Sequence, residues 1–204
     1  MLTVGLTGSI AVGKSYVCQI LRDAGFPVLD ADITAREVVA AGSRGLASVV
    51  AAFGSEILLD SGEMNRSKVA SIVFTDPEKL KLLNSIVHPL VFEAQDKWLR
   101  EQAAIRPDGV AIVDAALMIE SGGYKRFHKL VVVWCDPDIQ LRRLMARDGF
   151  DENAAKLRIA SQIPQDEKKR FADYLIDTSN GFEDTRDQVQ ALTTRLKDLA
   201  SNKE

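Results

Sequence analysis

Near the amino end of the chain, two glycines with four residues between them are followed at once by a lysine and a serine. Residues 8–15 read Gly-Ser-Ile-Ala-Val-Gly-Lys-Ser. The glycines allow a tight turn whose backbone N–H groups point into one concavity, the lysine supplies positive charge, and the serine hydroxyl can bind a divalent cation. The apolar run 2–6 predicts a strand before this turn, and apolar spacing over 16–24 predicts a helix after it. This order is typical of a loop that binds the phosphates of a nucleoside triphosphate, and the alternative is a chance match in a glycine-containing turn.

The composition fits a globular protein with one core and room for a lobe inserted into it. The chain has 204 residues, of which 46% are hydrophobic and 6% aromatic. Its apolar runs are short and broken by charges, and Met1 leads straight into the first strand, so we expect neither a membrane span nor a signal peptide. Cys18 and Cys135 are expected to be buried free thiols in a reducing cytoplasm, so the predicted location is cytoplasmic.

Charge is distributed unevenly along the chain. A net charge of −3 argues against a nucleic-acid-binding surface over the whole molecule. Residues 142–170 nevertheless hold eight lysines and arginines and five acidic residues. Within this segment Arg143 and Arg147 are four residues apart, so on a helix they share a face and suit a triphosphate. The alternative for each arginine is an ordinary surface ion pair.

The rest of the sequence alternates between strand and helix patterns, which predicts a parallel sheet with helices on both faces. The apolar, β-branched runs that read as strands are 2–6, 26–29, 110–113, 130–135 and 174–176. Helical patterns cover 138–148, 151–163, 165–172 and 183–200. A mainly helical stretch over about 33–105, divided by glycines and by the Asp76-Pro77 and His88-Pro89 pairs, is too long for a simple crossover. The predicted fold is a P-loop NTPase-type, three-layer αβα domain with a five-stranded parallel sheet, a helical substrate lobe between the second and third strands, and a helical lid after the fourth.

Four aspartates follow directly after predicted strands. Asp30 and Asp32 come after the second strand, Asp114 after the third and Asp136 after the fourth. Ligands of open α/β sheets bind beyond the carboxyl ends of the strands, so these aspartates and the phosphate loop are expected at one edge of the sheet. Asp32 is the candidate that orients, and helps to deprotonate, an attacking hydroxyl, with a helix N-cap as the alternative. For Asp30 a structural turn residue stands beside a metal or substrate contact.

A phosphate loop alone does not distinguish a kinase from a GTPase, a motor ATPase or a regulatory module. The chain lacks the Asn-Lys-x-Asp motif with which GTPases commonly recognise guanine, and it is too short for the extra modules of most motor ATPases. Its basic segment stands where small-molecule kinases place a closing lid. These features favour a small-molecule kinase. Two rivals remain: a small-molecule or nucleoside kinase with a different acceptor, and a regulatory module that binds ATP without transferring phosphate.

A series of motifs over nearly the whole chain resembles the dephospho-coenzyme A kinase family. The motifs are Gly5–Ser15, Asp30-Ala31-Asp32, Asn65-Arg66, Val73-Phe74, His88-Pro89, Ala116–Glu120, Gln140–Leu144 with Arg147, Gln162, Ala172-Asp173 and Ile176-Asp177. Each is weak alone, but their joint order and spacing are highly specific. The resemblance implies ATP-dependent phosphorylation of the ribose 3′-hydroxyl of dephospho-coenzyme A, the last step of coenzyme A synthesis.

We accordingly expect one kinase domain over residues 1–204. Its expected parts are a core of about 1–32, 106–137 and 173–204, an acceptor-binding helical lobe of about 33–105, and a lid region of about 138–172. The chain departs from the family pattern at Ala11 (usually Gly), Tyr16 (Thr), Ala116 (Pro) and Thr178 (Asn). Ala11 falls at a free position of the general motif, so the loop is expected to form with φ below zero there.

The candidate site residues combine the loop, the strand ends and the resemblance. For ATP we expect contacts from Gly8, Ala11, Val12, Gly13, Lys14, Ser15, Tyr16, Arg143 and Arg147. Asp32, Lys14 and Arg143 are the candidate catalytic residues, with Lys14 and Arg143 neutralising the migrating phosphoryl group. Mg²⁺ is expected to bind through Ser15, with Asp114 as a partner further out.

The acceptor side is expected to use Asp32, Arg66 and His88. The alternative for Arg66 is a surface ion pair, and the alternative for His88 is an N-terminal helix boundary or a packing group. The expected partners are ATP and dephospho-coenzyme A, with no nucleic acid and no membrane. The expected assembly is a monomer or a weak homo-oligomer.

Overall fold

In the computed structural model, which describes residues 1–201, five strands form one parallel sheet. The strands are β1 (Leu2–Gly8), β2 (Val28–Asp30), β3 (Val110–Asp114), β4 (Lys129–Trp134) and β5 (Tyr174–Asp177). Neighbouring strands are hydrogen-bonded in the order β2-β3-β1-β4-β5, and every pair is parallel. The five predicted strands are confirmed, and each of their ends lies within two residues of its predicted position.

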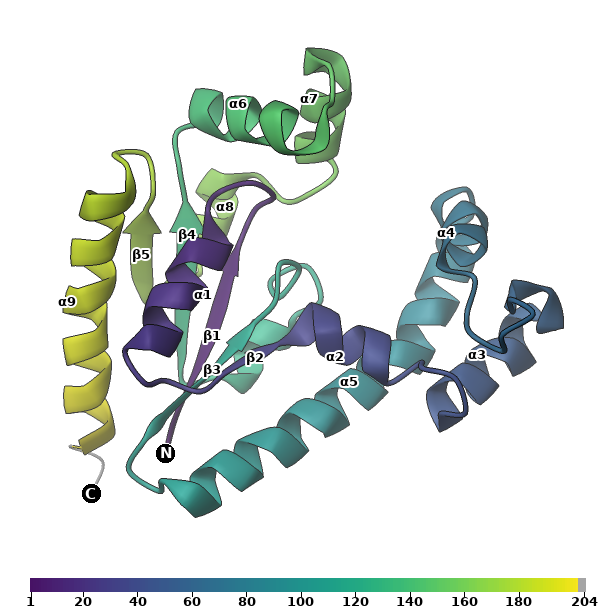
Figure 1. Cartoon of the computed structure of the whole chain (residues 1–204), viewed down its shortest axis with the longest axis horizontal. Helices are drawn as coiled ribbons and strands as arrows, with labels where there is room; N and C mark the ends of the chain where they lie inside the picture. Colours follow the sequence, from purple (N-terminus) through teal and green to yellow (C-terminus); the bar gives the residue numbers. More distant parts are fainter. Residues whose placement is uncertain (202–204) are drawn as a thin grey trace. The chain divides into compact units, whose positions relative to one another are not determined.

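Helices separate the strands along the chain, as Figure 1 shows. They are α1 (Lys14–Asp23), α2 (Ala31–Glu37), α3 (Arg44–Phe53), α4 (Arg66–Phe74), α5 (Pro77–Ile105), α6 (Pro137–Asp148), α7 (Glu152–Ala160), α8 (Gln165–Lys169) and α9 (Phe182–Ser201), with the 3₁₀ turns η1 (Ser55–Ile57) and η2 (Gly123–Arg126). The helical insertion between β2 and β3 and the helices after β4 are those that the sequence predicts. The predicted α/β fold of the P-loop type is therefore confirmed.

The chain divides into two compact units. Unit 1 consists of Met1–Asp30 and Glu101–Glu204, and unit 2 consists of Ala31–Arg100. Unit 1 contains the whole sheet together with α1 and α6 to α9, whereas unit 2 contains α2, α3, α4 and most of α5. The division falls directly after β2, whose last residue is Asp30, and within α5.

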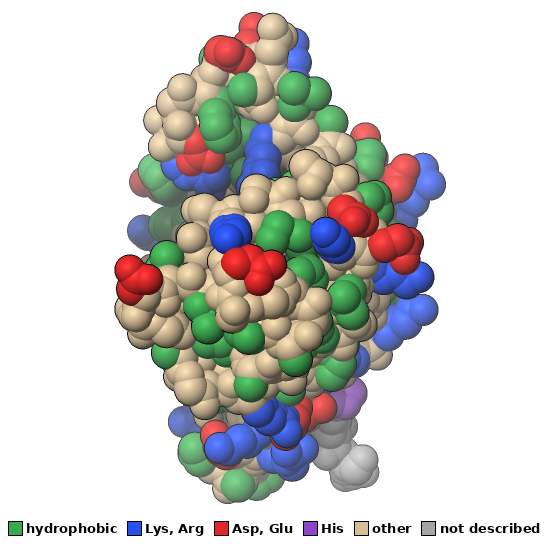
Figure 2. Space-filling model, turned by 90° about the vertical axis from the view of Figure 1, so that its right-hand side faces the viewer, with side chains coloured by type: hydrophobic (Ala, Val, Ile, Leu, Met, Phe, Trp, Pro, Cys, Tyr) green, Lys and Arg blue, Asp and Glu red, His purple; other side chains and the backbone are tan. Residues whose placement is uncertain are grey.

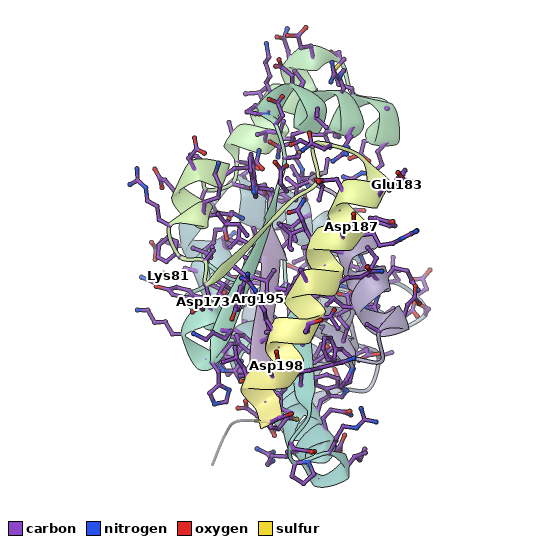
Figure 3. All side chains as sticks on the ribbon, turned by 90° about the vertical axis from the view of Figure 1, so that its left-hand side faces the viewer. Lys81, Asp173, Glu183, Asp187, Arg195 and Asp198 are labelled. Carbon is purple, nitrogen blue, oxygen red and sulfur yellow. The ribbon has the colours of Figure 1, made fainter. Side chains whose placement is uncertain are left out.

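The core of unit 1 lies between the sheet and the helices α1 and α9, which lie side by side (Figure 1). The strands β1, β3 and β4 are buried almost along their whole length, as expected for parallel strands covered on both faces. Helix α9 contributes Val189, Leu192 and Leu196 to this core. Its outer side carries charged residues, among them Glu183, Asp187 and Asp198 in Figure 3. The amphipathic pattern of the last helix is thus explained by packing alone.

Unit 2 has a small apolar core of its own. Its fully or nearly buried members are Val39, Val49, Ile57, Val69 and Val73, and side chains of α5 pack against them. On the face drawn in Figure 2, apolar side chains lie among charged side chains of both signs. Apolar atoms form much of the surface of any folded protein, so apolar side chains on this face need no functional explanation.

The two X-Pro pairs of unit 2 differ in their outcome. Asp76-Pro77 begins α5 as predicted: Asp76 Oδ1 accepts hydrogen bonds from the amides of Glu78 and Lys79 at 3.0 and 3.2 Å. The prediction that His88-Pro89 divides the helical stretch is wrong, because α5 continues through Pro89. An internal proline costs a helix about 3 kcal/mol, which the long flanking helical segments and their packing offset here.

No helix within residues 1–201 combines the length and the apolar content needed to cross a membrane.

The core packing of α9 yields a matched pair of variants. Leu196 is fully buried, whereas Leu199 on the same helix is 37% exposed. We predict that Leu196→Ala lowers the free energy of unfolding by about 2–5 kcal/mol, because it removes packed methyl groups and leaves a cavity. Leu199→Ala should lower the free energy of unfolding by well under half of that amount. Urea denaturation of both variants measures the difference, and equal losses would contradict this packing.

Candidate active site

The loop between β1 and α1 has the shape of a phosphate cradle. Gly13 adopts a left-handed φ of 85° and precedes the first turn of α1, which has no side-chain cap. The first N–H groups of a helix need acceptors, and together with the helix dipole they favour an anion. At the other end of the loop, a side chain on Gly8 would bring its Cβ within 2.5 Å of the Val133 carbonyl oxygen of β4. Glycine at position 8 therefore allows β1 and β4 to approach closely where the loop begins.

Ala11 departs from its predicted conformation. Its φ is +60°, and it is the one non-glycine with positive φ among residues 1–201. The expectation that the loop forms with φ below zero at this position is wrong. A left-handed conformation costs an alanine about 1–2 kcal/mol because its Cβ crowds the following carbonyl. The loop therefore contains strain that its surroundings must offset.

Lys14 forms an ion pair with Asp114, the last residue of β3. The other carboxylate oxygen of Asp114 accepts a hydrogen bond from the thiol of Cys18 at 3.2 Å. Burial, followed by the negative charge of Asp114, raises the pKa of the Cys18 thiol to about 12. The thiol is therefore a neutral donor at pH 7, and it orients the carboxylate that faces Lys14. Cys18 is thus a supporting residue of the site, a role that its position in an apolar helix pattern did not indicate.

Arg143 and the phosphate loop meet at Thr178, the residue after β5. The guanidinium of Arg143 donates to the Thr178 hydroxyl at 2.9 Å and to the Thr178 carbonyl oxygen at 2.8 Å. The same hydroxyl donates to the carbonyl oxygen of Val12 at 2.7 Å. Thr178, which departs from the family pattern, therefore joins the candidate arginine of α6 to the loop.

The second candidate arginine lies apart from this cluster. Arg147 forms a two-pronged ion pair with Asp148, at 2.7 and 2.9 Å, and its side chain is 56% exposed. Other cations of the basic segment are also paired: Lys156 with Glu152 and Lys169 with Asp166. These three ion pairs lie within residues 142–170, so they leave the net charge of the segment unchanged but occupy three of its cations. Arg143 is the arginine that contacts a residue bound to the loop.

Lys168 of α8 is fully buried. The charge pattern of the sequence does not distinguish it from the other lysines and arginines of the basic segment. Its ammonium group pairs with Glu120 at 2.7 Å and donates to the Ala116 carbonyl oxygen at 3.2 Å. The Thr7 hydroxyl of β1 donates to that same carbonyl oxygen. A buried charge needs a partner and hydrogen bonds. Lys168 therefore fastens the segment after Asp114 to the helices after β4.

Hydroxyl groups of the loop could serve a metal or a phosphate. Ser15 is exposed in the first turn of α1. The hydroxyl of Ser9 is buried and, among the described residues, has no hydrogen-bond partner. Buried hydroxyls are normally satisfied, so this one fits a ligand at the loop. Within residues 1–201, no group of three or more His, Cys, Asp or Glu side chains is arranged so that it could hold a metal ion. A divalent cation here would depend on one or two protein oxygens and on phosphates, as Mg²⁺ commonly does.

The carboxyl ends of the strands place several predicted residues in register. Asp30 of β2 stands opposite Asp114 of β3, and Gly8 of β1 stands opposite Val133 of β4. Asp136, in contrast, caps α6 by accepting a hydrogen bond from the Asp138 amide at 2.8 Å. Within unit 1, the predicted convergence on one sheet edge is thus confirmed for the loop, Asp30 and Asp114.

The predicted acceptor-side residues all belong to unit 2. Asp32 is exposed in the first turn of α2, two residues beyond Asp30. Arg66 begins α4 and donates to the Arg36 carbonyl oxygen at 3.3 Å, so it links α4 to α2. His88 lies within α5, with its ring 6.1 Å from that of Phe92, and burial lowers its pKa. A histidine with a lowered pKa is neutral at pH 7, so it would offer a hydrogen bond rather than a charge.

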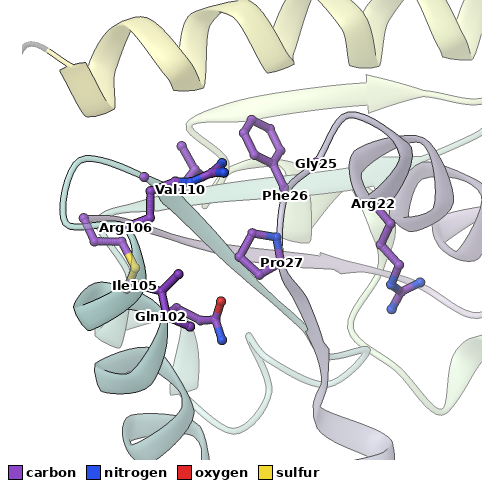
Figure 4. Close-up of a pocket in the computed structure, with 10 residues that line it drawn as sticks. Arg22, Gly25, Phe26, Pro27, Gln102, Ile105, Arg106 and Val110 are labelled. Carbon is purple, nitrogen blue, oxygen red and sulfur yellow. The ribbon is translucent and has the colours of Figure 1, made fainter.

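A pocket of about 370 Å³ lies at the opposite edge of the sheet (Figure 4). Its walls include Met1 before β1, Pro27 before β2 and Gly109 before β3. These are the amino ends of the strands, and no predicted site residue lines the pocket. The pocket and the candidate site at the loop therefore lie at opposite edges of the sheet.

A family model and relatives that match nearly the whole chain name the same family. A family model described as dephospho-CoA kinase matches residues 2–184. A dephospho-CoA kinase of Geobacillus kaustophilus is 46% identical over 193 residues, which cover 94% of each chain. One of Listeria innocua is 43% identical over 196 residues, covering 95% of this chain and 96% of the relative. The solved structure of the dephospho-CoA kinase from Campylobacter jejuni matches with a TM-score of 0.71 at 27% identity, covering 96% of this chain and 97% of that one.

The site geometry predicts the effect of removing the lysine of the loop. Lys14→Ala should weaken the binding of ATP by about one to two orders of magnitude, since charged hydrogen bonds to phosphate are lost. Calorimetric titration with ATP measures this loss. Lys156→Ala, which removes an exposed cation paired with Glu152, is the matched control and should leave binding unchanged. Unaltered affinity in Lys14→Ala would contradict the assignment of the loop.

Proposed function

The chain belongs to the dephospho-CoA kinase family, and we therefore propose that it transfers the γ-phosphoryl group of ATP to the ribose 3′-hydroxyl of dephospho-coenzyme A. The products are coenzyme A and ADP, and the reaction is the final step of coenzyme A biosynthesis. The observation that carries this proposal is the uncapped, glycine-bounded loop before α1, with Lys14 and Ser15 in the first turn, in a chain that matches the family over residues 2–184.

ATP binds with its phosphates against the loop. The N–H groups of the loop and of the first turn of α1 donate to phosphate oxygens, and the buried hydroxyl of Ser9 is available as a further donor. Lys14 exchanges its ion pair with Asp114 for the β- and γ-phosphates. This exchange replaces one negative partner by another, so the lysine remains neutralised at each stage.

Arg143 is the second cation of the transfer. Its guanidinium is held by two hydrogen bonds to Thr178, which fixes its direction at little entropic cost when charge develops. Arg147 is the weaker candidate, since it must first leave Asp148. Tyr16 follows Ser15 and packs edge-to-face on Phe182 at 4.8 Å, which supports a place beside the nucleotide for these rings.

Mg²⁺ fits the residues at the loop. The exposed hydroxyl of Ser15 would hold it together with phosphate oxygens and water, and Asp114 would act from further out. When bound, the ion neutralises charge on the β- and γ-phosphates. The protein contributes the position of the hydroxyl and the orientation of the Asp114 carboxylate through Cys18.

Asp32 acts on the acceptor. Its exposed carboxylate accepts a hydrogen bond from the 3′-hydroxyl and orients the oxygen toward the γ-phosphorus. The new bond forms between that oxygen and phosphorus, the bond to the β–γ bridging oxygen breaks, ADP leaves, and the hydroxyl proton passes to Asp32. Arg66 and His88, which belong to unit 2 like Asp32, hold the acceptor, and the helices after β4 shield ATP from water.

The remaining proposals concern the setting of the enzyme. Both cysteines are buried and free, which is in keeping with work in the reducing cytoplasm. We propose that the chain works as a monomer or a weak homo-oligomer.

The reaction is tested by identifying its product. Purified protein is incubated with ATP and Mg²⁺, with and without dephospho-coenzyme A, while ADP release is followed. The position of the new phosphate is then determined by mass spectrometry and phosphorus NMR. Acceptor-dependent ADP release with phosphate on the 3′-oxygen is the expected result. ADP release that ignores the acceptor would refute the proposed reaction and leave the nucleotide site intact.

The role of Asp32 predicts a separation of binding from turnover. Asp32→Asn should bind ATP as the unaltered protein does, while kcat falls by orders of magnitude, because the amide no longer accepts the proton. Glu37→Gln, an exposed acid-to-amide change at the other end of α2, is the control and should leave both quantities unchanged. Retained turnover in Asp32→Asn would remove this residue from the mechanism.

A further inference from the structure

Both backbone groups of Ile10, at the tip of the phosphate loop, are bound by glutamine side chains from distant parts of the sequence. The Ile10 amide donates to Gln162 Oε1 at 2.8 Å, and the Ile10 carbonyl oxygen accepts from Gln140 Nε2 at 2.8 Å. These bonds fix two consecutive peptide planes, the one before Ile10 and the one after it. A loop residue normally leaves such groups to water or to backbone partners.

A third glutamine fixes the amide of Gln140. Gln165 Nε2 donates to Gln140 Oε1 at 2.8 Å, and Gln165 Oε1 in turn accepts from the Cys135 amide at 3.1 Å. The donors follow one another from the Cys135 amide to Gln165, from Gln165 to Gln140 and from Gln140 to the Ile10 carbonyl oxygen. The orientation of each side-chain amide therefore follows from its neighbour. We call Gln140, Gln162 and Gln165 the glutamine clamp.

The clamp acts where the loop is strained. The peptide bound by Gln140 joins Ile10 to Ala11, and Ala11 is the residue with φ of +60°. With this peptide plane held on one side, and Val12 held by Thr178 on the other, Ala11 has little freedom to leave the left-handed region. A free alanine strongly prefers negative φ. The clamp thus holds Ala11 at positive φ. A glycine at this position would need less restraint, because it adopts positive φ without a Cβ penalty.

All members of the clamp come from the segment after β4. Gln140 lies in α6 and is 2% exposed, Gln162 lies between α7 and α8, and Gln165 is the first residue of α8. The same segment carries Arg143, which is bound to Thr178. The shape of the loop therefore depends on how α6 and α8 are packed.

We propose that the glutamine clamp is a positioning device for ATP, which holds Ile10 and the strained Ala11 in the conformation that binds phosphate and so couples the helices after β4 to nucleotide affinity. This inference rests on the proposed function only in taking ATP as the ligand. A purely structural clamp would have the same effect on ATP affinity whatever residue stood at position 11. The proposed clamp should affect ATP affinity more when residue 11 is a strained alanine than when it is a glycine.

The test is a double-mutant cycle on ATP affinity. Gln162→Met keeps the length of the side chain and removes the acceptor for the Ile10 amide. We expect Gln162→Met to raise the dissociation constant of ATP about tenfold, as for the loss of one hydrogen bond. In an Ala11→Gly background, where left-handed φ carries no Cβ penalty, the same Gln162→Met change should cost threefold or less.

Controls separate the possible failures. Gln19→Met changes an exposed glutamine that donates a hydrogen bond to Asp23 of the same helix, and it should leave ATP affinity unaltered. Thermal melting of each variant reports folding, and Gln165→Met, one step removed from the loop, supplies a milder version with a smaller effect in the same direction. An equal loss in the Ala11 and Ala11→Gly backgrounds would overturn the proposal. So would a lowered melting temperature with unchanged ATP affinity. Failure of the unaltered protein to bind ATP would instead refute the proposed function.

Discussion

The phosphate loop requires left-handed backbone at Ala11 and Gly13, two residues apart, and the packing around the loop keeps them there. Gly13 takes this conformation without penalty, but Ala11 does so at a cost of about 1–2 kcal/mol. The offset comes from side chains far away in sequence: Thr178 after β5 holds Val12, and glutamines from the segment after β4 hold Ile10. The loop conformation therefore depends on contacts with distant segments of unit 1, and we infer that these contacts set its shape before a nucleotide binds.

Side chains around the loop also orient the charged groups of the candidate site. Lys14 is paired with Asp114, whose second oxygen is bound by the neutral Cys18 thiol, so the lysine is directed along the sheet edge without an unpaired charge. Arg143 is aimed in the same way by Thr178. Groups that are already oriented lose little freedom when charge develops on a phosphoryl group, which is the main source of stabilisation in such reactions. In the proposed reaction, Cys18 and Thr178 thus contribute by orienting Asp114 and Arg143, without contacting the substrates themselves.

Much of this could be predicted from the sequence, because the informative signals are local. The β-branched runs predict the five strands, and the spacing of the glycines and Lys14 predicts the loop and the helix that follows it. The failures have tertiary causes. Pro89 lies inside α5 because the flanking helix and its packing outweigh the broken hydrogen bond, and Ala11 is left-handed because distant glutamines hold its neighbour. In the sequence Lys168 resembles the other cations of the basic segment, and its burial against Glu120 can be seen only in the folded structure. The roles of Asp32, Arg66 and His88 remain proposals.

The claim that the loop is formed before ATP binds is tested most directly by hydrogen exchange of its backbone amides, followed residue by residue by NMR. Without nucleotide, the account predicts slow exchange at Ile10, whose amide is bound by Gln162, and fast exchange at Lys14 and Ser15, which begin α1 without a side-chain cap. Addition of ATP and Mg²⁺ should then slow exchange at Lys14 and Ser15 and change Ile10 little. Fast exchange at Ile10 that slows only when nucleotide is added would show that ATP itself shapes the loop, and would contradict the account.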